Sequence, residues 1–149
     1  MTSNETRATT LVRALRAGIE GDRETLRACF TDDVRAWTPA LTTTSLTDLI
    51  DELDRRDDAF SDIDLDVVPL DVGGDHACVE WTVAMTHSGR ITLADDRSIE
   101  SSGIRIALHG VTVAEFHGEQ ICSLRQYWDE FAVLEQLGVL KRESERANE

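Results

Sequence analysis

Hydrophobic residues near the start of the chain recur at the spacing of amphipathic helices. Leu11, Leu15 and Ile19 lie four residues apart and form one apolar stripe, which predicts a first helix. Asp22 can cap a second, shorter helix, whose apolar or small residues are Leu26, Ala28, Cys29 and Phe30. The pattern therefore predicts a helical hairpin, followed by a brief strand at residues 34–38.

The middle of the chain changes from a helical to an extended pattern. Ser45 and Asp48 have the form of a capping box, and apolar residues at helical spacing follow over residues 46–53. The next segment alternates strictly between polar and apolar residues, which predicts a strand. The alternation slips at Val67 and Val68, and we interpret the slip as a bulge that bends the strand.

Three further strands are predicted in the second half of the chain. They span residues 77–87, 101–116 and 120–129, with a polar connection at Asp95–Asp96 and a tight turn at His117–Glu119. Helices followed by a meander of long strands are typical of the α+β class. We therefore expect the N-terminal helices to pack on the concave face of a curved, mainly antiparallel sheet.

The last two predicted strands are apolar on both faces. Odd positions carry Val111, Val113 and Ile121, and even positions carry Ala114, Phe116, Cys122, Leu124 and Trp128. The helices can cover only one of these faces, and a large apolar patch left in water usually marks a partner surface. The pattern predicts a two-fold homodimer formed through the sheet.

Length and charge narrow the classes of function. A chain of 149 residues has the size of one domain, which we place at residues 1–140, with a polar, disordered tail at 141–149. The net charge is -14, from 29 acidic and 15 basic residues. Such a charge repels the phosphate backbone, so we expect no nucleic-acid partner.

Cysteine usage and hydropathy bear on the compartment. Cys29, Cys78 and Cys122 are widely spaced and contain no CxxC pair, so we expect reduced thiols and no zinc site. The first ten residues are polar, and no segment approaches the roughly 20 apolar residues that span a bilayer. We expect a cytoplasmic protein with no membrane partner.

The closing segments of the chain resemble a known family. The stretch from Val111 to Ile121, the sequence LRQYWD at 124–129 and the sequence LEQLG at 134–138 are similar to the final hairpin and tail of SnoaL-like polyketide cyclases. The sequences FTDDV at 30–34 and THSG at 86–89, with a glycine at position 103, also resemble that family. The similarity extends from Leu11 to Leu140.

This resemblance implies an architecture and an activity. It implies the cone-shaped half-barrel of nuclear-transport-factor-two-like proteins, a homodimer, and a deep pocket between the sheet and the helices. It implies no metal and no cofactor. In the cyclases, an aspartate at the position of Asp129 is the general acid/base of an intramolecular aldol closure. Tyr127 and Glu115 stand where those cyclases carry histidines, which leaves the substrate open.

A three-residue loop at 117–119 would pair Glu115 with Ile121, Val111 with Arg125, and His109 with Tyr127. A two-residue loop would break this set. With the three-residue loop, Asp129 shares a strand face with Arg125 and Tyr127. This polar face either lines a wet pocket or faces solvent.

On the catalytic interpretation, an apolar cavity raises the pKa of Asp129 and makes it a usable base, while Tyr127 or His109 hydrogen-bonds a developing enolate oxygen. We expect substrate contacts from Trp37, Trp81, Glu115, Arg125 and Val113. The alternative is that Asp129 caps or ends the strand, that Arg125 pairs with Glu115 on the surface, and that His109 is a hydrogen-bonded wall residue. An ion pair between Arg125 and Asp129 would keep the Asp129 carboxylate acidic and would also argue against its role as a base.

Three functions remain open on these residues. The first is a cofactor-independent cyclase or isomerase that moves protons on an apolar, carbonyl-bearing or polyketide-like molecule. The second is an epoxide hydrolase of the same fold, although the segment at 79–83 lacks the Arg-x-Asp pair of those enzymes. The third is a dimeric module that binds a small molecule without turnover.

Overall fold

The computed structural model describes residues 3–92 and 96–140. In chain order, the elements are α1 (Ser3–Glu20), α2 (Arg23–Cys29), β1 (Phe30–Trp37), β2 (Thr42–Thr43), α3 (Leu46–Ala59), β3 (Phe60–Leu70), β4 (His76–His87), β5 (Ile91–Thr92), β6 (Ser98–Ile99), β7 (Arg105–His117), β8 (Gln120–Trp128) and α4 (Glu130–Gln136). No helix within these residues is both long and apolar enough to cross a bilayer.

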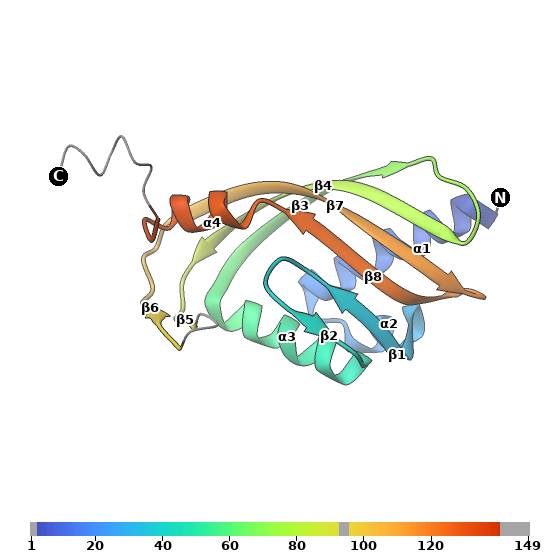
Figure 1. Ribbon diagram of the computed structural model, residues 1–149, viewed down its shortest axis with the longest axis horizontal. Coiled ribbons are helices and arrows are strands. Elements are labelled where there is room, and N and C mark those ends of the chain that lie inside the picture. Colours follow the sequence, from blue (N-terminus) through green and yellow to red (C-terminus); the bar gives the residue numbers. More distant parts are fainter. Residues whose placement is uncertain (1–2, 93–95, 141–149) are drawn as a thin grey trace.

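Six of the eight strands in the described residues form one curved sheet that the helices cover on a single side, and β5 and β6 form a separate two-stranded sheet. Six strands pair in the order β2-β1-β8-β7-β4-β3, and every neighbouring pair is antiparallel except β1 with β8, which is parallel. Figure 1 shows the long strands bending across the molecule, with α1 behind β7 and β8. The fold is therefore the α+β cone predicted from the sequence.

The core lies between the helices and the concave face of the sheet. Leu11 and Ala14 on α1 pack with Leu26 of α2 and Ile50 of α3 in a cluster that includes Val79 of β4. Each of these side chains is buried, with Leu11 and Val79 at 0 % exposure. The apolar stripes of the helices thus form the inner layer of the fold, as helical spacing predicts.

The predicted helix caps are confirmed by hydrogen bonds. Asp22 is the N-cap of α2 and accepts a hydrogen bond from the backbone N–H of Thr25 at 3.1 Å. Ser45 is the N-cap of α3 and accepts from the backbone N–H of Asp48 at 3.1 Å. Each cap satisfies an N–H group that has no partner within its own helix.

The bulge predicted at Val67 and Val68 is wrong. Pairing of β3 with β4 is continuous from Asp64 to Leu70, and the irregularity lies between Ser61 and Asp64, where Asp62 has a φ of 52°. The slip in alternation has another cause. Up to Val67 the apolar residues of β3 lie on the concave face, whereas Val68 lies on the outer face and is 60 % exposed.

The hairpin of β7 and β8 has a shorter loop than predicted. His117 pairs with Gln120 across a two-residue turn at 118–119, in which Gly118 has a φ of 63°. A register shift next to Glu115 then adds one residue on β8, so Glu115 pairs with Ser123. Odd positions still oppose odd positions, because the shorter loop and the bulge together move the register by two residues.

The strand predicted at 101–116 begins later than expected, at Arg105, and two segments without a predicted structure form regular elements. Residues 101–104 are irregular rather than extended, and the preceding segment forms a small β5–β6 hairpin. The apolar segment after β8 forms α4, whose Val133 packs with Ile106 of β7. The predicted connection at Asp95–Asp96 is described only at Asp96, and the predicted tail at 141–149 lies outside the described residues.

Gly110 lets two strands and a tryptophan approach one another closely. A Cβ atom at this position would lie 2.2 Å from the backbone oxygen of Tyr127 and 2.6 Å from the indole of Trp81. We expect Gly110→Ala to lower the free energy of unfolding by about 1–3 kcal/mol, because backbone and indole must both move. Urea denaturation measures this, with Gly73→Ala, which would meet nothing within 4 Å, as the control. Equal midpoints for the two variants would contradict the expectation.

Candidate functional site

A large hollow lies between the helices and the concave face of the sheet. Its volume is about 800 Å³, and α1, α3, α4 and strands β3, β4, β7 and β8 all contribute to its walls. The walls are mainly apolar, with side chains that include Leu15, Ile19, Leu53, Phe60, Ile63, Leu65, Val83, Met85, Leu108, Leu124, Val133, Leu134 and Leu137. A cavity of this size and character is typical of a small-molecule site.

Two tryptophans form part of the sheet side of this cavity. Trp81 of β4 and Trp128 of β8 both line it, and their ring centroids lie 6.2 Å apart in an edge-to-face arrangement. Gly110, the residue of β7 between them, pairs with both positions. Because glycine has no side chain, the two indoles meet across β7, and they provide an aromatic surface for a flat apolar ligand.

One buried polar group links the sheet to the cavity. The indole N–H of Trp81 donates to the hydroxyl oxygen of Thr112 at 2.9 Å, and Thr112 is 0 % exposed. The carboxamide of Gln126 lies against the same hydroxyl, with 3.2 Å between Nε2 and Oγ1, and Gln126 lines the cavity. An otherwise apolar wall therefore carries a carboxamide that the structure holds in place.

A carboxylate lies at the end of β8. Glu130, in the first turn of α4, lines the cavity, and its Oε2 accepts a hydrogen bond from the indole N–H of Trp128 at 2.6 Å. The indole holds Oε2, and within residues 3–92 and 96–140 no hydrogen bond to Oε1 is found. Gln126, Trp128 and Glu130 follow one another at alternate positions, so the cavity carries a carboxamide, an indole and a carboxylate in order.

The arginines that line the cavity, together with Glu52, have their own partners nearby. Arg55 forms an ion pair with Glu52 one turn away in α3. Arg56 donates to the backbone oxygen of Gly18 at 2.7 Å and pairs with Asp57, while Arg90 lies 2.9 Å from Glu100. Asp58 of α3 is a further lining carboxylate, and Glu130 differs from it in being held by an indole N–H at the end of β8.

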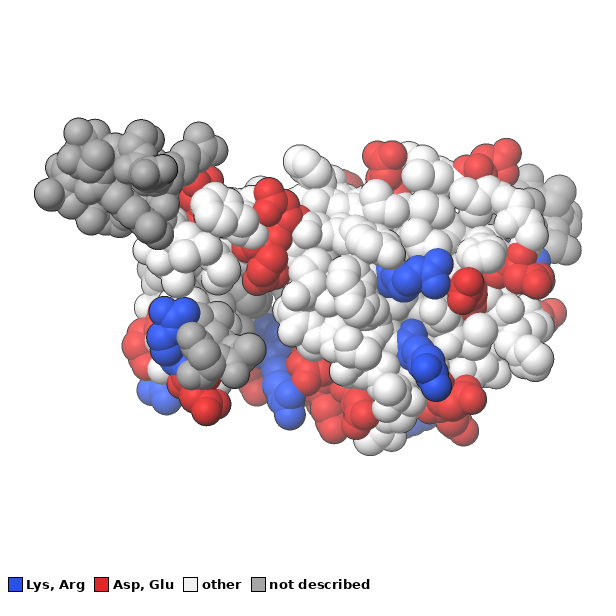
Figure 2. Space-filling model, viewed as in Figure 1, with Lys and Arg blue, Asp and Glu red and all other residues white. Residues whose placement is uncertain are grey.

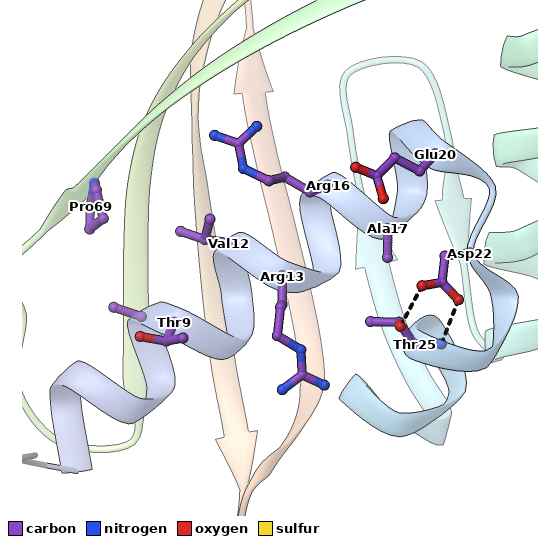
Figure 3. Close-up of a pocket in the computed structure, with 10 residues that line it drawn as sticks. Thr9, Val12, Arg13, Arg16, Ala17, Glu20, Asp22, Thr25 and Pro69 are labelled. Atoms are coloured by element: carbon purple, nitrogen blue, oxygen red, sulfur yellow. Dashed lines mark hydrogen bonds between the residues drawn. The ribbon is translucent and has the colours of Figure 1, made fainter.

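A second, shallower hollow of about 450 Å³ lies along the outer side of α1 (Figure 3). Arg13 and Arg16 line it, but Figure 3 shows their side chains pointing in different directions. Asp22 accepts two hydrogen bonds from Thr25, from its hydroxyl at 2.6 Å and its N–H at 3.1 Å, and these bonds hold the pKa of Asp22 below its usual value. The charged side chains of this smaller hollow do not converge on one point. We therefore take the larger cavity as the candidate site.

Most of the residues predicted to form the site lie on the outer face of the sheet. Register places Val113 beside Arg125 and places Tyr127 beside Val111, at odd positions that do not line the cavity. His109, opposite Thr82 of β4, and Trp37, opposite Arg125, share that face. The predicted face exists, but it is the convex one, because the helices cover the even positions of β7 and β8.

The outer-face residues form their own contacts. Glu115 lies 3.6 Å from Arg125 and 3.0 Å from His76, so the Arg125–Glu115 pair considered as an alternative is present. Trp37 and Tyr127 stack with ring centroids 5.2 Å apart and remain 41 % and 45 % exposed. Among the eight predicted site residues, Trp81 is the one that lines the cavity.

Asp129 lies at a helix cap outside the cavity lining. It is the N-cap of α4, accepts a hydrogen bond from the backbone N–H of Ala132 at 3.2 Å, and is exposed. The apolar surroundings that its predicted role requires are therefore missing, and the capping alternative is the arrangement found. Proton transfer by Asp129, Tyr127 or His109 stays a prediction.

The sequence analysis missed Gln126, Thr112 and Glu130. A signal for Gln126 was present, because it interrupts the apolar even positions between Leu124 and Trp128. A single polar residue within an apolar strand face has to find a partner or a ligand. Glu130 carried no such signal, because only the helix that begins there turns it toward the cavity.

Comparisons with known proteins agree with this architecture. The model of the SnoaL-like domain matches residues 9–124. No curated protein sequence matches the chain significantly. Among solved structures, a proposed SnoaL-like polyketide cyclase from Jannaschia sp. CCS1 is 17% identical, with a TM-score of 0.81 over 95% of this chain and 98% of that one.

Two other structural neighbours carry different functional names. AclR from Streptomyces galilaeus, a proposed hydroxylase, is 19% identical, with a TM-score of 0.78 over 94% of this chain and 85% of that one. An epoxide hydrolase of the LEH-like type from M. tuberculosis is 15% identical, with a TM-score of 0.70 over 91% and 92% of the two chains. At these identities the likeness shows the shared fold, which hosts several chemistries.

Proposed function

The chain belongs to the SnoaL-like family, and from that premise we propose that its cavity binds a largely apolar, carbonyl-bearing small molecule and moves protons on it. The observation that supports the proposal is the 800 Å³ apolar cavity with a carboxylate, Glu130, in its wall. An apolar wall selects a ligand of low polarity by removing its surface from water. The carboxylate supplies the acid/base group that a cyclase or an isomerase needs.

The proposed chemistry uses Glu130 as a general base. Its free oxygen takes a proton from the carbon next to the carbonyl, the C–H electron pair moves toward the carbonyl oxygen, and an enolate forms. Return of the proton to a different carbon of a conjugated enolate, or to the opposite face of the same carbon, completes an isomerisation. Attack of the enolate carbon on a second carbonyl, followed by transfer of the proton from Glu130 to the alkoxide that forms, completes an aldol closure. Trp128 holds the carboxylate in place through the bond to its other oxygen.

Exchange of α-protons tests this function without a known substrate. We use 2-acetylnaphthalene, an apolar aromatic ketone, in D₂O and follow loss of its methyl signal by NMR. The protein should accelerate exchange above the buffer rate, and an excess of naphthalene should suppress the acceleration by occupying the cavity. A ketone that binds but exchanges at the buffer rate would instead identify a binding module without turnover.

Asp129→Asn distinguishes the role of Asp129 from that of the adjacent Glu130. Asparagine is as good an N-cap as aspartate, so α4 keeps its cap while the charge is lost. Because Asp129 lies outside the cavity lining, we expect the exchange rate to stay within about twofold of the original, a change of less than ~0.5 kcal/mol in the barrier. A much slower rate in this variant would favour Asp129 as the base.

We further propose that two copies of the chain associate through the outer face of the sheet. In the view of Figure 2, which faces this side, uncharged side chains cover much of the surface over the sheet, basic side chains lie among them, and acidic residues gather along the upper and lower edges. The exposed apolar side chains of this face include Trp37, Tyr127 and Val68. An exposed aromatic patch of this kind is typical of a self-complementary interface.

Trp37→Arg tests the dimer. The new charge would lie next to Arg125, its register partner, and like charges at the centre of an interface oppose association. We expect the variant to sediment as a monomer at concentrations where the original sediments as a dimer. Phe131→Arg, which changes an equally exposed aromatic residue on α4 (48 % against 41 %), should leave the dimer intact. Two variants with the same sedimentation would contradict this interface.

A further inference from the structure

The hydroxyl of Thr112 constrains how the carboxamide of Gln126 is oriented. The hydroxyl oxygen accepts the indole N–H of Trp81 at 2.9 Å, and this direction is fixed because an indole nitrogen can only donate. The hydroxyl therefore has its own proton left to donate. In the described part of the chain, the other polar group that contacts it is the carboxamide of Gln126.

Two orientations of this carboxamide fit the same positions. Oxygen and nitrogen of a carboxamide have nearly the same size, so the hydrogen-bond network decides between them. With the nitrogen of Gln126 toward Thr112, the hydroxyl would accept two bonds and its buried proton would have no acceptor. With the oxygen toward Thr112, the hydroxyl accepts from Trp81 and donates to Gln126, so its oxygen and its proton both have partners.

We propose that the NH₂ group of Gln126 points into the cavity and donates a hydrogen bond to a carbonyl oxygen of the ligand. The inference rests on the proposed function and specifies its substrate class: a ketone or ester whose carbonyl lies against β8. Gln126 lines the cavity, and its neighbours on the same strand face, Leu124 and Trp128, are apolar. In this apolar part of the wall, the NH₂ group of Gln126 is a hydrogen-bond donor and therefore favours a ligand that carries an acceptor.

The position of Gln126 also suits the chemistry. Gln126 precedes Trp128 by two residues on the same face of β8, about 7 Å away along the strand. Glu130, in the first turn of α4, accepts the indole N–H of Trp128, so both polar groups border this indole in the cavity wall. A ligand over the Trp128 indole can place its carbonyl oxygen at Gln126 and its α-carbon toward Glu130. When the base removes the proton, negative charge develops on the oxygen that the NH₂ group faces, where a fixed donor is most effective.

A matched pair of probes tests the hydrogen bond. The probes are 2-acetylnaphthalene and 2-isopropenylnaphthalene, which differ by C=O against C=CH₂ and have nearly the same shape. Their dissociation constants are measured by tryptophan fluorescence for the original protein and for Gln126→Glu. The carboxylate keeps an acceptor for the Thr112 proton but has no NH₂ group, so the fold is preserved while the donor is lost.

We expect Gln126→Glu to lower the preference for the ketone over the alkene by about tenfold. The carbonyl stretch of the ¹³C-labelled ketone should move to higher frequency in this variant, because a hydrogen bond weakens C=O. Thr82→Val, on the opposite face of the sheet, should change neither quantity. Failure of both probes to bind would overturn the proposed function together with this inference, whereas binding with an unchanged preference would overturn this inference alone.

Thr112 acts as a positioning residue, and its variants supply a second readout. Thr112→Val removes the hydroxyl at nearly constant volume, frees the carboxamide, and should lower the ketone preference by about threefold, less than Gln126→Glu does. Thr112→Ser restores a hydroxyl and should restore the preference. A merely structural role would change the binding of both probes equally in Thr112→Val, and that result would contradict the orientation we infer.

Discussion

Glu130→Gln is expected to slow the protein-dependent α-proton exchange of 2-acetylnaphthalene by about 10²–10⁴-fold, the usual contribution of a general base. Glutamine keeps the shape of the side chain and an oxygen that can accept the Trp128 indole N–H at the 2.6 Å contact. It lacks the charge and the basicity needed to take a proton from carbon. Binding of the ketone should therefore change little while the exchange rate falls.

The comparison with Asp129→Asn decides which carboxylate acts. Both variants remove one negative charge at adjacent positions of the same helix start, so general electrostatic effects on the cavity are matched. The account requires a large loss in Glu130→Gln and almost none in Asp129→Asn. The reverse pattern would assign the base to Asp129 and would require the ligand to reach the outer side of the helix start.

Trp81→Ala is expected to lower the free energy of unfolding by about 3–5 kcal/mol. Trp81 is 8 % exposed, contacts Trp128 edge to face, and donates to Thr112, so its truncation enlarges the cavity and leaves a buried hydroxyl without its donor. A loss of this size is a large share of the total stability of a small domain. Thermal and urea denaturation measure it.

Trp37→Ala provides the matched control for that stability change. Trp37 is 41 % exposed on the outer face, so its truncation should cost about 1 kcal/mol or less in the monomer. Measurements at several protein concentrations separate this cost from any loss of dimer stability. Similar destabilisation by Trp37→Ala and Trp81→Ala in the monomer would show that the concave wall is not the packed centre of the fold.

Local patterns were sufficient to predict most of the helices and strands of this protein. The stripe of Leu11, Leu15 and Ile19 and the caps at Asp22 and Ser45 depend on residues close in sequence, and each was found as expected. The change from helical spacing to alternation marked the start of the sheet. Family resemblance in the final hairpin added the cone shape, which local periodicity does not determine.

The site was harder to predict, because it depends on which face of each strand the helices cover. Alternation separated the two faces of β8 correctly, but both faces carry apolar residues, so the pattern could not say which one is concave. The row of polar groups at Arg125 and Tyr127 resembled a pocket wall and lies on the outer face instead. The β-strand ends at Trp128, which makes Asp129 a helix cap and turns Glu130 inward.

Indole resonances of the three tryptophans test the central claim most directly. Trp81 and Trp128 line the cavity, whereas Trp37 lies on the outer face, so each N–H signal reports one side of the sheet. In ¹⁵N-labelled protein titrated with 2-acetylnaphthalene, with signals assigned by single Trp→Phe variants, the account predicts shifts of the Trp81 and Trp128 signals and a stationary Trp37 signal. A shift confined to Trp37 would place the ligand outside the cone and contradict the account.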